Sequence, residues 1–190
     1  MEHIKRIAIV GNAGSGKSTL TRQLQSILKL PVYHLDKYYW KPGWVPVDPF
    51  EYSQLHDMLC ERDEWIMDGM NLRLLLTRID AADMIIFLDI PRYKCLWRVI
   101  KRTLMNYGKE RLDSPAGCPE GFSFAFLKFL KWVWKFKKYY KGRIYAYLKI
   151  EQDFQDEMRG QNGFQPKEFY VLRSQKEIDE FIKKLKTHQL

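Results

Sequence analysis

The stretch GNAGSGKS, residues 11–18, decides how this chain folds. It matches G-x-x-x-x-G-K-S, the pattern of a phosphate-binding loop. Residues 4–10 before it form a short, mostly apolar run rich in β-branched side chains, which is typical of a buried strand. After it, Leu20, Leu24, Ile27 and Leu28 recur at helical spacing until Pro31 ends the helix. The motif therefore joins a strand to a helix N-terminus, which is the context that phosphate binding requires.

The chemistry of this loop predicts a bound nucleoside triphosphate. Its glycines let the backbone curl so that N–H groups point inward, and the dipole of the following helix adds partial positive charge. Lys17 can reach the β- and γ-phosphates, and the Ser18 hydroxyl can ligate Mg²⁺. A glycine-rich turn that binds nothing is the alternative, but every motif position matches. We expect ATP to contact Gly11, Asn12, Ala13, Gly14, Ser15, Gly16, Lys17, Ser18 and Thr19.

Length and composition predict a single domain over residues 1–190. Hydrophobic residues make up 46% of the chain, an ordinary content for a globular protein. No apolar run reaches the length of about 18 residues that would suggest a membrane span, and the first strand begins too early for a signal peptide. The cysteines, Cys60, Cys95 and Cys118, are widely spaced, which argues against a disulfide framework or a zinc site. We therefore expect a cytoplasmic protein with no membrane partner.

The positive charge of the chain is concentrated in one region. The net charge is +9, but residues 92–150 hold 15 Lys or Arg against 3 Asp or Glu, a net charge of +12. The remaining residues hold 17 basic against 20 acidic side chains, a net charge of −3. A basic region of this kind needs an anionic partner, and phosphate groups or nucleic acid are the obvious candidates.

Strand and helix patterns alternate along the chain. Apolar runs at residues 32–35, 65–67, 84–88 and 169–172 predict four further strands. Amphipathic patterns predict helices at 52–61, 72–79, from about 93, over 122–150 and at 177–185, and residues 151–165 are expected to include a loop. This alternation predicts an α/β fold with a five-stranded parallel sheet, helices on both of its faces and a helical lid insertion.

The segment after the second strand is the predicted acceptor-binding insertion, residues 37–62. Asp36 stands at the carboxyl end of that strand, where α/β folds bind their ligands. Residues 37–50 read as an ordered loop with three prolines and five large aromatic side chains, among them Trp40 and Trp44. Two interpretations stay open: these aromatics pack a small subdomain, or some of them wall a pocket for the acceptor.

Residues 103–142 are predicted to form a basic, aromatic lid. An apolar stripe of Phe126, Phe129, Leu130, Val133, Phe136 and Tyr140 runs between lysines over its helical part. The stripe can pack inward with the lysines in water, or the helix can bind nucleic acid or cover a phosphate site. We favour packing combined with a phosphate cover. Before this segment, Arg98 and Arg102 lie at i, i+4 spacing on one helix face.

Several blocks of the sequence carry a resemblance to a known family. They are His34-Leu35-Asp36, Trp40-Lys41-Pro42-Gly43-Trp44, Trp65-Ile66-Met67-Asp68-Gly69 and Gly117-Cys118-Pro119-Glu120. With the phosphate loop and the arginine pair, they cover the chain from its first strand to about Arg143. The chain resembles the nucleoside monophosphate kinase branch of P-loop proteins, and more closely the small bacterial DNA topology modulation, or FlaR-related, proteins.

The resemblance to adenylate-kinase-like enzymes implies roles for individual residues. Asp68 would hold Mg²⁺ through water, together with Ser18. Arg73 would grip the acceptor, and Arg98 and Arg102 would contact the nucleotide base and its phosphates. Arg111 and Asp113 resemble the start of the lid, and Arg143 is a candidate for a second lid arginine. The Gly-Phe-Pro-Arg block of adenylate kinases is replaced by Gly69-Met70-Asn71-Leu72-Arg73, so the acceptor is not identified.

Together these observations predict an ATP-dependent phosphotransferase that acts on an unidentified small acceptor. Lys17, Arg98, Arg102 and Arg111 would neutralise the charge of the transferred phosphoryl group. Asp36 would orient or deprotonate the acceptor, with Arg73 and Trp40 beside it. Two alternatives stay open: a nucleotide-dependent protein that binds DNA or modulates its topology, and a P-loop NTPase that only hydrolyses its nucleotide.

Overall fold

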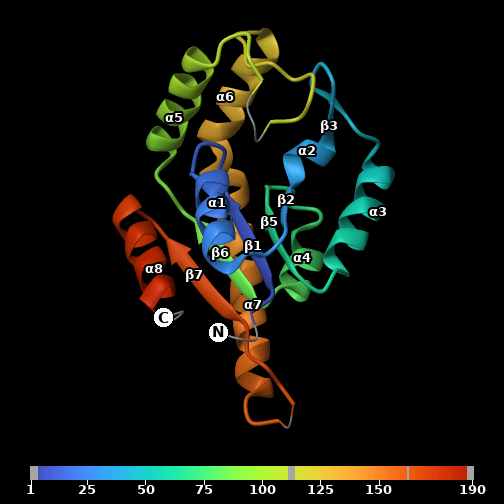
Figure 1. Ribbon diagram of the computed structural model, residues 1–190, viewed down its shortest axis with the longest axis vertical. Coiled ribbons are helices and arrows are strands. Elements are labelled where there is room, and N and C mark those ends of the chain that lie inside the picture. The colour runs from blue at the N-terminus through green and yellow to red at the C-terminus, as the bar shows by residue number, and fades with distance from the viewer. Residues whose placement is uncertain (1–3, 111–113, 162, 188–190) are drawn as a thin grey trace.

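The computed structural model describes residues 4–110, 114–161 and 163–187, and its centre is a parallel sheet of five strands (Figure 1). The strands are β1 (Arg6–Gly11), β2 (Val32–His34), β5 (Trp65–Asp68), β6 (Met84–Leu88) and β7 (Glu168–Leu172). They lie in the order β2-β5-β1-β6-β7, and each neighbouring pair is parallel. The predicted α/β fold with a five-stranded parallel sheet is confirmed.

Strand β1 shows why the central strands are apolar at consecutive positions. Ile7 and Ile9 pack into the core on one face of the sheet, whereas Ala8 and Val10 pack into the core on the other. All four side chains are fully buried. Side chains alternate between the two faces of a strand, so a sheet that is covered on both faces needs an apolar residue at every position.

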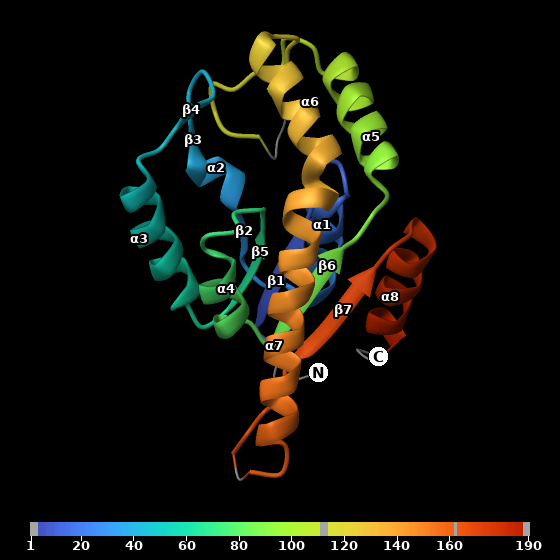
Figure 2. The same cartoon turned by 180° about the vertical axis from the view of Figure 1, so that it is seen from behind.

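Helices cover both faces of the sheet (Figures 1 and 2). The core on one face includes α1 (Lys17–Leu28), α5 (Arg92–Met105) and α8 (Gln175–Thr187), and the core on the other includes α3 (Pro49–Cys60), α4 (Leu75–Ala81) and α7 (Gly142–Met158). Among the described residues, no helix combines the length and the apolarity needed to cross a bilayer.

One continuous helical rod runs along the face of the sheet that is turned toward the viewer in Figure 2. It consists of α6 (Phe124–Phe136), a π-helical turn η1 (Lys137–Lys141) and α7. Phe126 and Val133 join the core on one face of the sheet, and Phe136 joins the core on the other. The predicted inward packing of the apolar stripe is therefore confirmed for these three side chains. The expected loop within 151–165 begins only after Met158, where α7 ends.

The predicted insertion, residues 37–62, is more regular than the sequence indicated. After α2 (Leu35–Tyr39), the strands β3 (Trp40–Lys41) and β4 (Val45–Pro46) form an antiparallel hairpin instead of a loop. The Asp48 side chain then caps α3, accepting hydrogen bonds from two backbone N–H groups of its first turn, and a proline stands at the first helical position. The rings of Tyr39 and Tyr52 pack edge to face, 5.1 Å apart between centroids, and connect the hairpin segment to α3.

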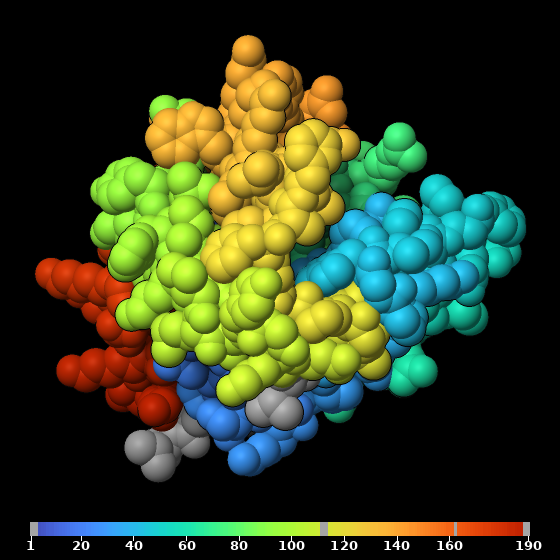
Figure 3. Space-filling view, turned by 90° about the horizontal axis from the view of Figure 1, so that it is seen from above, coloured from blue at the N-terminus to red at the C-terminus, as the bar shows by residue number. Residues whose placement is uncertain are grey.

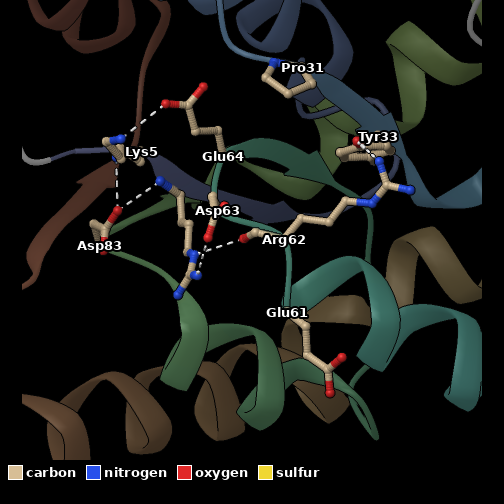
Figure 4. Close-up of a pocket in the computed structure, with 9 residues that line it drawn as sticks. Lys5, Pro31, Tyr33, Glu61, Arg62, Asp63, Glu64 and Asp83 are labelled. Carbon is tan, nitrogen blue, oxygen red and sulfur yellow. Dashed lines mark hydrogen bonds and ion pairs between the residues drawn. The ribbon is translucent and has the colours of Figure 1, made fainter.

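An open hollow of about 700 Å³ lies at the amino edge of the sheet (Figure 4). Several of its charged groups pair with one another. Lys5 Nζ lies 3.2 Å from Glu64 Oε1, and an Asp83 carboxylate oxygen accepts hydrogen bonds of 2.8 Å from the backbone N–H groups of Lys5 and Arg6. Ligands of parallel α/β sheets bind at the opposite edge, outside the carboxyl ends of the strands. The candidate site is therefore sought there.

The packing of the helical rod can be tested with two isoleucines of α7. Ile144 is fully buried against the sheet, whereas Ile150 on the same helix is mostly exposed. We expect Ile144→Ala to lower the free energy of unfolding by about 2–5 kcal/mol, because it removes three carbons from a packed core. Ile150→Ala should change it by about 0.5 kcal/mol or less. Urea denaturation measures both values, and equal effects would contradict the packing of the rod on the sheet.

Candidate functional site

The phosphate loop follows β1 and packs closely against α5. Gly14, in the middle of the loop, has a backbone φ of +75°, in the left-handed region that favours glycine. A side-chain carbon at this position would collide with the backbone carbonyl of Cys95 and press on Val99, both on α5. The loop is further pinned because Asn12 Nδ2 donates a 2.8 Å hydrogen bond to the Val133 carbonyl of α6. The loop conformation therefore depends on two helices that come much later in the chain.

Lys17 stands at the start of α1 and folds back over the loop. Its Nζ donates hydrogen bonds to the carbonyls of Gly11 at 3.1 Å and Asn12 at 3.0 Å. Burial lowers the pKa of Lys17, and the carboxylates of Asp36 and Asp68 oppose this shift. The cation is thus held over the loop, between the carboxyl ends of β1, β2 and β5.

Asp68 ends β5 and is almost fully buried. Thr21 Oγ1 donates a 2.9 Å hydrogen bond to its Oδ2, and His34 Nδ1 lies 2.9 Å from its Oδ1. Burial alone would raise the pKa of Asp68, but the hydrogen bond and charge of His34, with the charge of Lys17, outweigh it and lower that pKa. Asp68 is therefore ionised at neutral pH and held in a fixed orientation.

The residues at this edge fit a magnesium ion that is held mainly by phosphate oxygens and water. Ser18 offers a hydroxyl on the first turn of α1. Each Asp68 carboxylate oxygen has a second lone pair beyond the one used by Thr21 or His34, so a metal-bound water could still donate to it. In the described part of the chain, no group of three or more His, Cys, Asp or Glu side chains is arranged to hold a metal. Mg²⁺ in nucleotide sites needs few protein ligands, which agrees with this donor set.

Arg98 contacts the phosphate loop from α5. Its Nη1 donates to the Ser15 carbonyl at 3.2 Å, and its Nη2 donates to Gln175 Oε1 at 3.3 Å. Between these groups lies a small cavity of about 130 Å³, lined by Gly16, Thr19, Leu20, Gln23, Arg98, Gln175 and Ile178. Gln175, at the start of α8, was not among the residues singled out from the sequence, because it belongs to no motif.

Arg102 lies one helical turn beyond Arg98 on α5. Its Nε is 3.1 Å from Glu120 Oε1, and Thr103 Oγ1 donates a 2.7 Å hydrogen bond to the other oxygen of the same carboxylate. The charge of Arg102 also lowers the pKa of Lys17, although less than burial does. The predicted pair of arginines therefore approaches the phosphate loop from one helix face.

The predicted lid, residues 103–142, divides into two parts. Its helical part belongs to the packed rod described above. Its loop part reaches across the carboxyl edge and contacts the β3–β4 hairpin: the Gly43 N–H donates to the Gly117 carbonyl at 2.8 Å, and Trp44 Nε1 donates to the Pro119 carbonyl at 3.1 Å. Cys118 Sγ also donates to the Lys41 carbonyl at 3.3 Å. Two blocks quoted from the sequence, 40–44 and 117–120, thus form one contact.

The acceptor side contains a buried cation that the sequence analysis missed. Arg78 on α4 is fully buried, and its Nη2 donates to the Gly69 carbonyl at 3.1 Å. Its Nε and Nη1 have no hydrogen-bond partner among the described atoms. Burial lowers the pKa of Arg78, while Tyr52, Asp68 and Asp36 raise it. No sequence motif marks it, because a buried arginine in a helix has the same sequence pattern as an exposed one.

The remaining predicted residues have different surroundings. Asp36 is exposed on α2, near enough to affect the pKa of Lys17. Trp40 is half-buried, with its ring 4.8 Å from that of Tyr39. Arg73 and Arg143 are exposed, the first before α4 and the second on α7. Arg111 and Asp113 lie outside the described residues.

Some solved structures of other proteins are similar to this chain. No family model matches the chain, and no curated protein matches it. A solved structure from Chloroflexus aurantiacus, described only provisionally as a kinase, has a TM-score of 0.52 at 11% identity and covers 98% of both chains. A shikimate kinase from Aquifex aeolicus has a TM-score of 0.47 at 16% identity, covering 97% of this chain and 95% of its own. A deoxyadenosine kinase from M. mycoides has a TM-score of 0.46 at 16% identity, and the match covers 95% of this chain and 98% of the kinase chain.

At these identities a likeness describes the fold alone. The fold shared with the Chloroflexus aurantiacus protein is a parallel sheet with helices around it. The phosphate loop and the cations around it occupy the carboxyl edge of this sheet.

The contact between the loop and the hairpin can be tested with two glycines. Gly117 has φ +69°, and an added side-chain carbon would meet Pro42 Cβ at 2.6 Å. Gly108 has nearly the same φ, +71°, but meets nothing within 4 Å. We expect Gly108→Ala to cost about 1–2 kcal/mol through backbone strain alone, and Gly117→Ala to cost about 1–3 kcal/mol more through the clash. Thermal unfolding of both variants measures the difference, and equal losses would contradict the contact.

Proposed function

We propose that this protein is an ATP-dependent kinase that transfers the γ-phosphate of ATP to a hydroxyl group of a small acceptor. The observation that carries this proposal is the convergence of one cation and two carboxylates, Lys17, Asp36 and Asp68, at the carboxyl edge beside the phosphate loop. Phosphoryl transfer needs positioning and neutralised charge more than covalent chemistry, and this group of residues supplies both.

On the nucleotide side, the loop backbone, Lys17 and Arg98 would bind the phosphates. The small cavity beside Gly16 would admit part of the nucleoside, with Gln175 at its wall. Mg²⁺, when bound, would add positive charge at the β- and γ-phosphates, and Ser18 and Asp68 are the residues that would hold it. Arg98 and Arg102 approach the loop from α5, and with Arg111 they would neutralise the charge that the transferred group carries.

On the acceptor side, Asp36 is the group that would orient the attacking hydroxyl or accept its proton. It is exposed at the edge of the phosphate loop, so an acceptor could reach it. Trp40 and Arg73, from the elements on either side, would contact the rest of the acceptor. The charge of Asp36 acts to raise the pKa of the buried Arg78, so the two groups interact electrostatically. A carboxylate can accept a proton in this role.

The resemblance to the topology modulation proteins remains part of the proposal, as does a cytoplasmic location. The contact between segments 40–44 and 117–120 supports a shared role for these two blocks, because both cover the same edge of the sheet.

One assay distinguishes a kinase from an enzyme that hydrolyses ATP without an acceptor. ATP and Mg²⁺ are incubated with a panel of nucleosides, nucleotides and sugars, and acceptor-dependent release of ADP is measured. If no compound stimulates release, the kinase proposal is contradicted.

The role of Lys17 gives a direct test of nucleotide binding. We expect Lys17→Ala to abolish measurable ATP binding, because the loop loses the side-chain cation that donates hydrogen bonds to the carbonyls of Gly11 and Asn12. Isothermal titration of ATP measures this in the presence of Mg²⁺. Lys183→Ala on α8 serves as a control that removes the same charge at a distance, and it should bind ATP as the unmodified protein does. Undiminished ATP affinity in Lys17→Ala would exclude the phosphate-loop assignment.

The role of Asp36 is tested separately from nucleotide binding. We expect Asp36→Asn to lower acceptor-dependent turnover by about 10²–10⁴-fold, the typical contribution of a general base, with ATP affinity nearly unchanged. Steady-state kinetics use the acceptor that the panel identifies. Asp63→Asn, in the loop before β5, removes a highly exposed carboxylate and should leave turnover unchanged. A collapse of ATP affinity in Asp36→Asn would instead assign this carboxylate to the metal site.

A further inference from the structure

The outward faces of α5 and α6 expose large apolar side chains to solvent. Each of these side chains is between 43% and 73% exposed. We call them the outer α5–α6 face, which consists of Tyr93, Trp97, Leu104 and Met105 on α5 and Phe124, Leu127 and Trp134 on α6. None of them takes part in the candidate site. Apolar surface of this extent on a monomer usually marks an interaction site.

Helical spacing places these side chains together. On α5, Tyr93, Trp97 and Leu104 follow one another at i, i+4 and i+11, opposite the buried side chains of Cys95 and Val99. On α6, Leu127 and Trp134 are seven residues apart, two turns along one side of the helix, and Lys131 lies between them.

The two helices lie side by side (Figures 1 and 2). The Arg92 guanidinium stacks over the Trp134 ring, 4.1 Å from its centroid, and joins their outer faces. Seen from above, these segments form one broad part of the surface (Figure 3).

The charge of this face has one sign. Residues 92–105 hold five Lys or Arg and no acidic residue, and residues 121–150 hold eight and no acidic residue. Arg98 donates to the phosphate loop and Arg102 pairs with Glu120, but Lys94, Lys101, Lys128, Lys131 and Lys135 are exposed among the apolar side chains. A partner that fits this face therefore carries negative charge and also accepts apolar side chains.

We infer that the outer α5–α6 face docks on the surface of an anionic phospholipid bilayer. Aromatic and aliphatic side chains gain free energy on entering the boundary between headgroups and acyl chains, while lysines pair with the phosphates of anionic lipids. The phosphates of duplex nucleic acid could pair with the lysines, but a duplex has no apolar layer that Leu104, Met105 or Leu127 could enter. The expectation of no membrane partner rested on the absence of a spanning segment, and surface docking requires none. The inference goes beyond the proposed kinase activity and does not depend on it.

The test is co-sedimentation of the full-length protein with vesicles of phosphatidylcholine, either pure or with about 30 mol% phosphatidylserine. We expect binding to the anionic vesicles only, and weaker binding as salt is raised. Replacing Lys128 and Lys131 by Ala should weaken binding by about fivefold for each lysine. The control replaces Lys183 and Lys184 on α8, which should leave binding unchanged.

A second pair of variants tests the apolar part of the face. Leu127→Ser should weaken binding to the anionic vesicles several-fold. Met58→Ser on α3 removes a side chain of similar exposure outside this face and should have no effect. Circular dichroism and thermal unfolding of each variant verify that it is folded.

Three results would overturn the inference. One is the absence of binding to either kind of vesicle. Another is binding that Leu127→Ser leaves unchanged. The third is binding to duplex DNA, or self-association, that the same lysine and leucine substitutions abolish while vesicle binding is absent.

Discussion

The seating of the phosphate loop against α5 and α6 is the constraint on which the rest of the structure depends. At Gly14 the loop approaches the α5 backbone so closely that no side chain fits. At Asn12 its side chain bonds to the Val133 carbonyl of α6. The loop can therefore hold its curled conformation only if the helical rod is packed in place, and the rod in turn is held by the cores on both faces of the sheet.

Charged side chains of both signs are concentrated at the carboxyl edge of the sheet, around the phosphate loop. Lys17, Arg98, Arg102 and Arg78 come from three helices, α1, α5 and α4, and Asp36, Asp68 and Glu120 lie among them. Buried charges are costly unless they are paired. The hydrogen bonds of Asp68 to Thr21 and His34 keep this carboxylate fixed and ionised beside the loop. Such fixed charge suits a ligand whose own charge is large and negative.

The edge is covered by two segments that lie more than 70 residues apart in the chain. The hairpin at 40–46 and the loop at 117–120 meet through hydrogen bonds to backbone carbonyls and through close packing of Gly117 on Pro42. Glu120 extends this contact to α5, because it pairs with Arg102 and accepts a hydrogen bond from Thr103. The segment that covers the edge is thus connected to the helix that carries the arginines.

The sequence by itself determined the fold class, the strands of the central sheet and the phosphate-loop motif. These features are local: a strand, a glycine-rich turn and a helix start are written in consecutive residues, and buried parallel strands are apolar throughout. It also indicated Asp36 through its position after a strand, and Asp68, Arg98 and Arg102 through the resemblance to adenylate-kinase-like enzymes. Only the tertiary structure decided that His34 and Thr21 hold Asp68, that Gln175 and Arg78 adjoin the site, and that the helical part of the predicted lid is a packed rod. Those contacts join residues far apart in sequence, and their pairing depends on how the helices pack.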